Sequence, residues 1–582
     1  MKIFRVLSPL FLWVLSSAFL PASAEEPAWN IRTVPLERVT VVAHRGAGHL
    51  APENTLSALE LTWSMGGAPE TDIRTTKDGH LVMFHDNNFK RILPNAPEEM
   101  KNKRIEDLTW AEVEQLDIGA FRGEKFKGQK VISLAELVEA LKKDRSRQVF
   151  IDVKNVDFSQ LARETEGVHE QVILATGSDA QTVEWKKLVP ISDAFLWMGL
   201  GAGDDKLAPR IETLKENHFG SIDRMQIHVN FDENGKTTPS EEFLRTTAAF
   251  VHKNYPNVEF QLMPWNAPEK KEYYWKLADL GAGGFGTDRP DVAFEALREY
   301  YEQGSTADWN VRDHIALDQV IVQAHRGFGD FGPEGSDDSF RRAWEMGLVP
   351  EADLRLTKDK KIVSFHDNDF YRILPNAPEE MKKKKVADLT LEEVKALDIG
   401  SFRGEEFKGQ RALSLAEIVE ALKADPKKLV YLDIKDVDFD QLAAESVSVH
   451  RQIIVASTVY DQILAWKKAA PRSWTIHWMG GTEEQLRKRI AALKEKDFHG
   501  IDQLQIHMNI DSAGNCSPSL EFMREVGTEL RKRGILFQSL IWEKPGSVAE
   551  NYHRLMDAGV ASFATDYPEA TMKAIRDYYE KK

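Results

Sequence analysis

Residues 39–46 read Val-Thr-Val-Val-Ala-His-Arg-Gly, and residues 320–327 read Val-Ile-Val-Gln-Ala-His-Arg-Gly. Each stretch predicts a short buried β-strand that ends in a polar triplet. The same spacing of 281 residues, from position 44 to position 325, separates the two copies of four further motifs: Pro52-Glu53, Glu70-X-Asp72, His85-Asp86 and Asp152-X-Lys154. The chain is therefore an internal duplication, and a repeat of this length is a whole domain rather than a solenoid turn.

Strands and helices alternate along each half. Apolar segments such as 81–84, 148–151 and 171–175 predict strands, whereas segments 55–65 and 134–142 predict helices. This alternation is typical of a parallel sheet, and its repetition within one half favours a closed barrel. We predict an α/β chain of two tandem TIM (β/α)8 barrels. The barrels should be distorted, because the first half offers nine candidate strands and the segment from Asp72 to His85 is too short for a helix.

The first residues predict export. Lys2 and Arg5 precede an apolar run, and Ala22-Ser23-Ala24 provides small residues for cleavage, so residues 1–24 are interpreted as a secretory signal peptide. A membrane anchor is disfavoured because the run is shorter than the ~20 residues of a spanning helix and contains Pro9. The mature protein should be periplasmic or secreted, with no transmembrane segment. We expect barrels at 38–303 and 319–582, joined by a linker at 304–318.

Composition limits the partners. The chain of 582 residues has one cysteine, Cys516, so each domain must be stabilised by its hydrophobic core rather than by disulfides. The formal net charge of -16 disfavours binding to nucleic acid, whose backbone is also negative. We therefore expect a small-molecule partner. The oligomeric state stays open.

Three carboxylates in each half are expected to meet. Glu70 and Asp72 are two residues apart, so on a strand both side chains point to the same face. Asp152 should join them from a neighbouring strand, because the carboxyl ends of barrel strands share one face. Gathered carboxylates repel one another unless a cation neutralises them. A hard divalent cation with oxygen ligands, Mg²⁺ or Ca²⁺, is the predicted cofactor.

The remaining motif residues suit phosphodiester cleavage. His44 and His85 can exchange protons near neutral pH, and Arg45 and Lys154 supply fixed positive charge for phosphate oxygens. One histidine would activate the nucleophile and the other would protonate the leaving alcohol. Each residue alone is weak as a signal, since single histidines and acidic pairs are common on surfaces. The repeated combination is much more specific.

Together with Pro-Glu-Asn-Thr (52–55), Thr-Lys-Asp-Gly (76–79) and Thr-Asp-X-Pro (287–290), these motifs resemble the glycerophosphodiester phosphodiesterase family. The resemblance covers nearly all of both halves. It implies a barrel of the phospholipase-C-like phosphodiesterase superfamily, a divalent metal, and hydrolysis of glycerophosphodiesters to glycerol 3-phosphate and an alcohol. It implies acid/base histidines at His44, His85, His325 and His366, substrate-binding residues at Arg45, Glu53, Lys154, Arg326, Glu334 and Lys435, and metal ligands at Glu70, Asp72, Asp152, Glu351, Asp353 and Asp433.

Some positions depart from the family pattern. Both halves have Asp where the third ligand is usually Glu. The second half replaces Asn54 by Gly335 and Gly79 by Lys360, which should remove a side-chain hydrogen bond and place a lysine in a turn that suits glycine. If one site is weaker it should be the second, although we expect both to bind metal.

Several alternatives remain at this stage. The chain could act on another diester, such as a phosphorylated sugar or wall polymer, or be a duplicated binding protein without turnover. The nucleophile could be water or an internal substrate hydroxyl. A shared insert, at 91–100 and 372–381, could shape the pocket or pack against the neighbouring domain.

Overall fold

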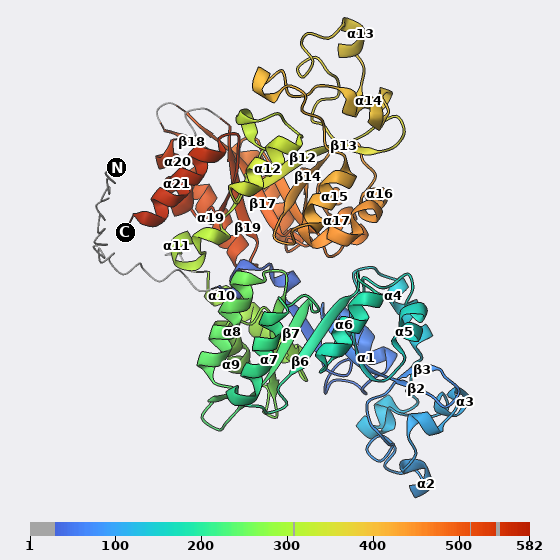
Figure 1. The fold of residues 1–582 in the computed structure, drawn as a ribbon. Helices are drawn as coiled ribbons and strands as arrows, with labels where there is room; N and C mark the ends of the chain where they lie inside the picture. Colours follow the sequence, from blue (N-terminus) through green and yellow to red (C-terminus); the bar gives the residue numbers. More distant parts are fainter. Residues whose placement is uncertain (1–28, 306–308, 512–513, 543–547, 582) are drawn as a thin grey trace, which may run out of the picture.

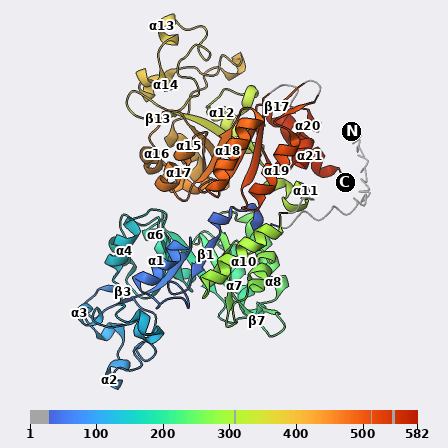
Figure 2. The ribbon, with the colours of Figure 1, turned by 180° about the vertical axis from the view of Figure 1, so that it is seen from behind.

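The computed structural model describes residues 29–305, 309–511, 514–542 and 548–581, so the predicted signal peptide lies outside the described residues. Figure 1 shows two domains stacked one above the other, each with strands at its centre and helices around them, and Figure 2 shows the same arrangement from behind. The predicted domain bounds stay predictions. No described helix combines the length and apolar character needed to cross a membrane.

The first domain is a closed parallel barrel. Its eight strands pair in the order β1-β10-β9-β7-β6-β5-β4-β2, and the β1–β2 pair closes the ring. The core strand β5 reads Val-Ile-Leu-Ala-Thr and is buried throughout, as expected for a strand covered on both faces. The strands are β1 (Thr40–Ala43), β2 (Ala68–Thr75), β4 (Val149–Asn155), β5 (Val172–Thr176), β6 (Asp193–Met198), β7 (Arg224–Phe231), β9 (Glu259–Trp265) and β10 (Gly284–Thr287).

The second domain repeats this topology, with the β11–β12 pair closing the ring. Its barrel strands are β11 (Ile321–Ala324), β12 (Val349–Leu356), β14 (Val430–Ile434), β15 (Ile453–Ser457), β16 (Trp474–Met479), β17 (Gln503–Ile510), β19 (Leu536–Ile541) and β20 (Ser562–Thr565). The predicted fold class, two tandem barrels of the TIM type, is confirmed.

Helices cover both barrels from outside. In α4, Leu134, Leu137 and Leu141 face the core, and a capping box between Ser133 and Glu136 fixes the first turn. Around the first barrel lie α1 (Leu56–Ser64), α4 (Leu134–Lys142), α5 (Phe158–Glu164), α6 (Asp179–Leu188), α7 (Asp204–Glu216), α8 (Glu241–Asn254), α9 (Lys271–Asp279) and α10 (Pro290–Gln303). Around the second lie α12 (Asp337–Glu345), α15 (Leu415–Lys423), α16 (Phe439–Ser446), α17 (Tyr460–Ala469), α18 (Glu483–Glu495), α19 (Leu520–Arg531), α20 (Ala549–Asp557) and α21 (Pro568–Glu580).

The ninth candidate strand lies outside the ring. Strand β3 (Leu81–Met83) turns back through Asp78-Gly79 and pairs antiparallel with β2, and β13 (Ile362–Ser364) does the same on β12. The short segment between Asp72 and His85 is therefore a hairpin. Short strands β8 (Thr237–Thr238) and β18 (Cys516–Ser517) are similar additions to β7 and β17.

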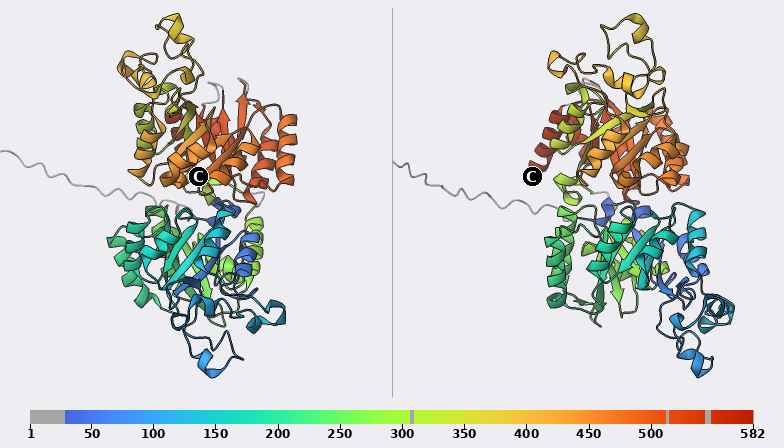
Figure 3. Two further views of the ribbon diagram at one scale, coloured as in Figure 1. Left: turned by 90° about the vertical axis from the view of Figure 1, so that its right-hand side faces the viewer. Right: turned by 45° about the vertical axis from the view of Figure 1, so that its right-hand side comes forward.

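Each hairpin leads into an excursion that contains the shared insert. The first holds α2 (Glu98–Lys101) and α3 (Trp110–Val113), and the second holds α13 (Glu379–Lys382) and α14 (Leu391–Ala396). The first packs around its own apolar cluster, which includes Phe89, Ile92 and Ile105. The views in Figure 3 place the two excursions at opposite ends of the molecule.

The barrels meet through the ends at which their strands begin. Asp193, the first residue of β6, contacts Arg451 and Arg472 of the second barrel. In return, Arg38 of the first barrel lies 2.5 Å from the carboxylate of Asp502, which directly precedes β17. The carboxyl ends of the two sets of strands therefore face away from each other.

Candidate active site

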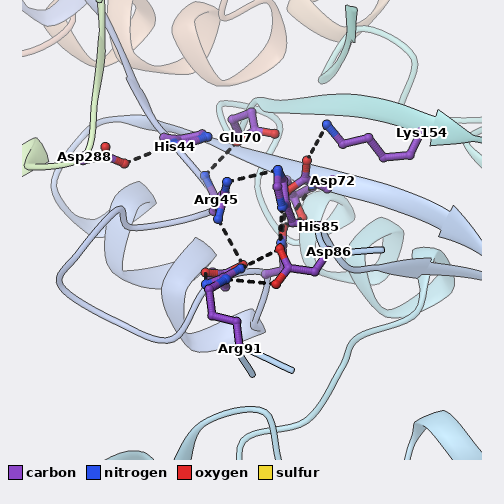
Figure 4. A network of polar contacts seen from close by, with 12 residues as sticks. His44, Arg45, Glu70, Asp72, His85, Asp86, Arg91, Lys154 and Asp288 are labelled. Carbon is purple, nitrogen blue, oxygen red and sulfur yellow. Dashed lines mark hydrogen bonds and ion pairs between the residues drawn. The ribbon is translucent and has the colours of Figure 1, made fainter. Parts of the chain in front are cut away.

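The predicted residues of the first barrel meet at the carboxyl ends of its strands (Figure 4). His44 and Arg45 directly follow β1, and Asp288 directly follows β10. Arg45 adopts a positive φ of 56°, and its amide donates a hydrogen bond of 2.7 Å to Glu70 Oε2. A non-glycine residue in this conformation is strained, and such strain is concentrated at functional sites.

Three carboxylates form one cluster, as predicted. Glu70 and Asp72 lie on β2, and Asp152 on β4 is the direct register partner of Asp72. One oxygen from each of the three lies within 4.8 Å of the others. Burial raises the pKa of Glu70 to about 8, and the charge of Asp72 adds to this effect. The cluster thus has more negative charge than its surroundings stabilise, and its all-oxygen donor set fits a hard divalent cation.

Lys154 partly balances this charge. Its Nζ lies 3.0 Å from Asp72 Oδ1 and 2.7 Å from Asp152 Oδ2. Glu70 has no lysine of this kind and instead accepts the Arg45 amide. The Asp at position 152 still reaches the cluster, although its side chain is one methylene shorter than the Glu of the family pattern.

The two histidines differ in their partners. His44 Nδ1 lies 2.9 Å from Asp288 Oδ1. Burial lowers the pKa of His44, but the hydrogen bond to Asp288 and the charge of Glu70 outweigh burial, so the pKa lies above its ordinary value. His85 Nδ1 lies 2.7 Å from Asp86 Oδ1, and its Nε2 lies 3.0 Å from Arg45 Nη2. Since a guanidinium only donates, His85 Nε2 is the acceptor and the ring is neutral in this arrangement.

Arg91 completes a closed ring of polar contacts around His85. Its guanidinium binds both oxygens of Asp86 at 2.9 and 2.8 Å, and both oxygens of Glu53 at 2.6 Å. Glu53 is buried and also lies 3.5 Å from Arg45 Nη1, and Arg45 returns to His85. Both arginines, Arg45 and Arg91, therefore contact the carboxylate of Glu53. The ring connects the insert directly to a predicted catalytic histidine.

Sequence reasoning did not assign a role to Arg91, Asp86 or Asp288. Asp86 and Asp288 were visible as the second residues of the His-Asp and Thr-Asp-X-Pro motifs, which also recur in the second half. Arg91 opens the shared insert, so its conservation between the halves was the available signal. The insert shapes the pocket region of its own barrel, which answers the question that the sequence left open.

The second barrel reproduces the whole arrangement. Arg372 binds Asp367 and Glu334, His366 lies between Asp367 and Arg326, and His325 binds Asp566. Glu351, Asp353 and Asp433 form the matching cluster, with Lys435 Nζ 2.9 and 2.8 Å from the two aspartates. Every residue predicted for the two sites therefore lies in one of these two assemblies.

A sequence model of the glycerophosphoryl diester phosphodiesterase family matches residues 44–292 and 325–570. The chain belongs to this family. A glycerophosphodiester phosphodiesterase of Caldanaerobacter subterraneus is 24% identical over 279 residues, which cover 45% of this chain and 99% of the relative. Glycerophosphodiester phosphodiesterase 1 of mouse is 37% identical over 125 residues, which cover 21% of this chain and 35% of the relative.

Solved structures show the same extent of similarity. A glycerophosphodiester phosphodiesterase from Agrobacterium tumefaciens has 20% identity and a TM-score of 0.35, covering 44% of this chain and 99% of that chain. An Oleispira antarctica phosphodiesterase in complex with the product sn-glycerol-3-phosphate has 20% identity and a TM-score of 0.33, covering 44% of this chain and 96% of that chain. The Caldanaerobacter subterraneus relative, 99% of which matches 45% of this chain, thus corresponds in length to about one of the two barrels.

The two sites differ beside the carboxylates. Asn54, at a φ of 57°, accepts hydrogen bonds from Thr71 Oγ1 and the Asp72 amide, and its Nδ2 donates to Asp72 Oδ2 at 3.2 Å. Gly335 keeps the same backbone conformation, with a φ of 65°, and lines a cavity of about 10 Å³ together with Asp353. That volume is close to the minimum for one water molecule. The expected loss of a side-chain hydrogen bond is confirmed.

The turn substitution also behaves as expected. Lys360 has a φ of 59°, in the left-handed region that Gly79 occupies at 87° in the first half. A lysine there costs about 1 kcal/mol relative to glycine. The turn is far enough along the hairpin that β13 still pairs with β12 in register.

Proposed function

We propose that each barrel is a metal-dependent phosphodiesterase that hydrolyses glycerophosphodiesters to glycerol 3-phosphate and an alcohol. One observation carries the proposal: three clustered carboxylates and two histidines, each bound to its own aspartate, lie at the active face of both barrels. Membership of the family and the product named for the Oleispira antarctica relative support the choice of substrate.

The cation would be held by Glu70, Asp72 and Asp152 in the first barrel and by Glu351, Asp353 and Asp433 in the second. When bound, a divalent cation such as Mg²⁺ or Ca²⁺ stabilises negative charge on phosphate oxygens. The donor set does not distinguish the two ions, because both prefer oxygen ligands.

The protein's own residues supply the remaining steps. Arg45 and Lys154 would bind the phosphate oxygens of the diester, which draws the Arg45 guanidinium away from His85 Nε2. His85 is then a neutral base for the attacking water, or for an internal substrate hydroxyl whose cyclic phosphate product water would then open, and its Nδ1 keeps its proton and donates it in a hydrogen bond to Asp86 Oδ1. His44, which Asp288 and Glu70 favour in the protonated form, would give a proton to the leaving alcohol.

Turnover of a glycerophosphocholine-type substrate tests the metal dependence. We expect chelator to abolish release of glycerol 3-phosphate by the intact chain, and Mg²⁺ or Ca²⁺ to restore it. Full activity in chelator would remove the role given to the carboxylates. A panel of other phosphodiesters on the same preparation tests the head group, since a sugar or wall-polymer diester that is cleaved faster would replace the proposed substrate.

Histidine variants test whether both barrels work. If the two sites act independently, His44→Ala and His325→Ala should each keep the activity of one barrel, and the double variant should have none. Substantial activity in the double variant would contradict the catalytic role of this histidine. A double variant that still binds the diester but does not turn it over supports the enzyme over the binding-protein alternative.

The proposal includes export of the chain after removal of residues 1–24. The test is N-terminal sequencing of the protein recovered from the periplasm or medium, which should begin at Glu25. Recovery of the intact N-terminus in the cytoplasm would contradict export without affecting the proposed chemistry.

A further inference from the structure

A cavity of about 50 Å³ lies between the two barrels, far along the strands from either candidate active site. Arg32 lines it from the segment before β1, Trp309 and His314 from the connection between the domains, and Arg531 from the end of α19. His314 ends α11 (Val311–His314), which lies at the junction of the two domains (Figure 1). The cavity is therefore built from both halves of the chain.

The lining of this cavity is positively charged. It contains two arginines and a histidine, and no acidic side chain among the described residues lines it. The contrast with the whole chain is large, because the sequence has 92 acidic and 76 basic residues. Burial lowers the pKa of His314 and the charge of neighbouring Asp313 opposes this, but the charges of Arg32 and Arg531, which line the same cavity, lower the pKa further.

Neither arginine has a carboxylate partner. Within the part of the chain that the structure describes, no acidic oxygen lies within 4.0 Å of Arg32 or Arg531. Arg32 packs over the Tyr300 ring at 3.6 Å and donates from Nε to the Tyr300 carbonyl. Arg531 packs over Trp309 at 4.5 Å, donates to Thr528 Oγ1, and keeps a buried Nε without a partner. Two cations that share a sheltered cavity normally require a counter-charge.

The first barrel contains a related tryptophan whose neighbour is uncharged. The motif Trp-Asn-X-Arg occurs at 29–32 and again at 309–312. Trp29 stacks on His252 at 3.7 Å, and His252 Nε2 lies 2.8 Å from the Gly281 carbonyl. Burial lowers the pKa of His252 to about 4, so that ring is neutral and satisfied. The second tryptophan, Trp309, stacks on His314 at 5.3 Å, and a permanent cation, Arg531, packs over it as well.

We propose that this cavity binds a phosphate-class oxyanion through the guanidinium groups of Arg32 and Arg531. Planar guanidinium groups match the oxygens of phosphate, and the bound anion would link the first barrel to the second. A cavity of about 50 Å³ exceeds the ~10–15 Å³ that one water needs and suits a small oxyanion. The anion could be free phosphate or a phosphate monoester. The inference does not depend on the proposed catalytic function.

The test is equilibrium dialysis of the full chain against radiolabelled inorganic phosphate in the presence of chelator. Chelator weakens phosphate binding at the carboxylate clusters, whereas a site made of arginines needs no metal. We expect one bound phosphate per chain, and a loss of at least about tenfold in affinity in Arg531→Gln, because a guanidinium–phosphate contact is charge-assisted. Arg524→Gln, an exposed position on the same helix, is the matched control and should bind like the unmodified chain.

Arg32→Gln changes the side of the cavity that belongs to the first barrel, and it should cause the same loss of phosphate affinity. This second variant keeps the test informative if Arg531→Gln does not fold. Unlabelled glycerol 3-phosphate distinguishes the two sources of the anion: displacement of the label supports a monoester site, and no displacement supports a site for free phosphate. Unchanged affinity in both arginine variants, or no metal-independent binding by the unmodified chain, would overturn the proposal.

Discussion

Arg91 offers the sharpest test of the site geometry. Replacing it by Ala removes four charge-assisted hydrogen bonds, two to Asp86 and two to Glu53. Glu53 would then retain only the contact of 3.5 Å with Arg45, and Asp86 would no longer be fixed behind His85. Proton transfer by a positioned side chain contributes about 10²–10⁴-fold to rate, and loosening the histidine should forfeit part of this.

We expect Arg91→Ala to lower kcat about 10–100-fold, which corresponds to about 1.4–2.7 kcal/mol of transition-state stabilisation. The assay is glycerol 3-phosphate release at saturating substrate in a His325→Ala background, so that the first barrel alone is measured. The effect should fall mainly on kcat rather than KM, because Asp86 and Glu53 already hold four of the five N–H donors of Arg91. Arg91→Lys keeps the charge but not the fork, so partial rescue is expected.

The control is Arg104→Ala, an arginine in the same excursion that pairs with exposed Asp107 and should not affect turnover. Unchanged kcat in Arg91→Ala would refute the link between the insert and His85.

Three further predictions concern Glu70, Asn54 and Asp502. Because Glu70 without a cation holds its proton up to about pH 8, binding of Mg²⁺ or Ca²⁺ at pH 7 should release about one proton per site. Calorimetry in buffers of different ionisation enthalpy measures this release. Cation binding without proton release would contradict the raised pKa of Glu70. Asn54→Gly gives the first barrel the residue that the second barrel has at Gly335. In the His325→Ala background it should lower kcat/KM of the first barrel about tenfold, because Asp72 loses two hydrogen bonds. An unchanged kcat/KM would show that the side-chain amide of Asn54 does not position Asp72. Asp502 is buried, and Arg38 and Lys467 hold its pKa at about 2, below the ordinary 3.8. Its contribution is present above pH 3.8 and is lost as pH falls toward 2, so Asp502→Asn should cost at least about 2 kcal/mol in urea unfolding at pH 6 and less at pH 3, and an equal cost at both would refute the assignment.

The sequence predicted the site well because a parallel barrel gathers distant strand ends at one face. Once β1, β2 and β4 were recognised, the positions of His44, Glu70 and Asp152 at their carboxyl ends followed from geometry that all such barrels share. The position of the ninth candidate strand could not be predicted. The residue pattern shows that a segment is extended, but it does not show which neighbouring strand the segment pairs with. The structure resolves this by pairing β3 with β2 outside the ring.

The remaining features depend on tertiary packing that residue periodicity does not encode. The path of the insert is set by contacts such as Phe84 on Phe89, and only that path brings Arg91 to Asp86. The docking of the barrels was also out of reach of sequence reasoning. Its central residue, Asp193, has no counterpart in the other repeat, where Trp474 begins the matching strand.

This docking has a functional consequence. The barrels contact each other at the amino ends of their strands. The two candidate active sites, at the carboxyl ends, therefore lie at opposite ends of the molecule. A diester that is released from one site cannot pass directly to the other site, and must diffuse through the solvent around the protein. The duplication therefore gives two separate sites, and a substitution beside one of them should leave the geometry of the other unchanged.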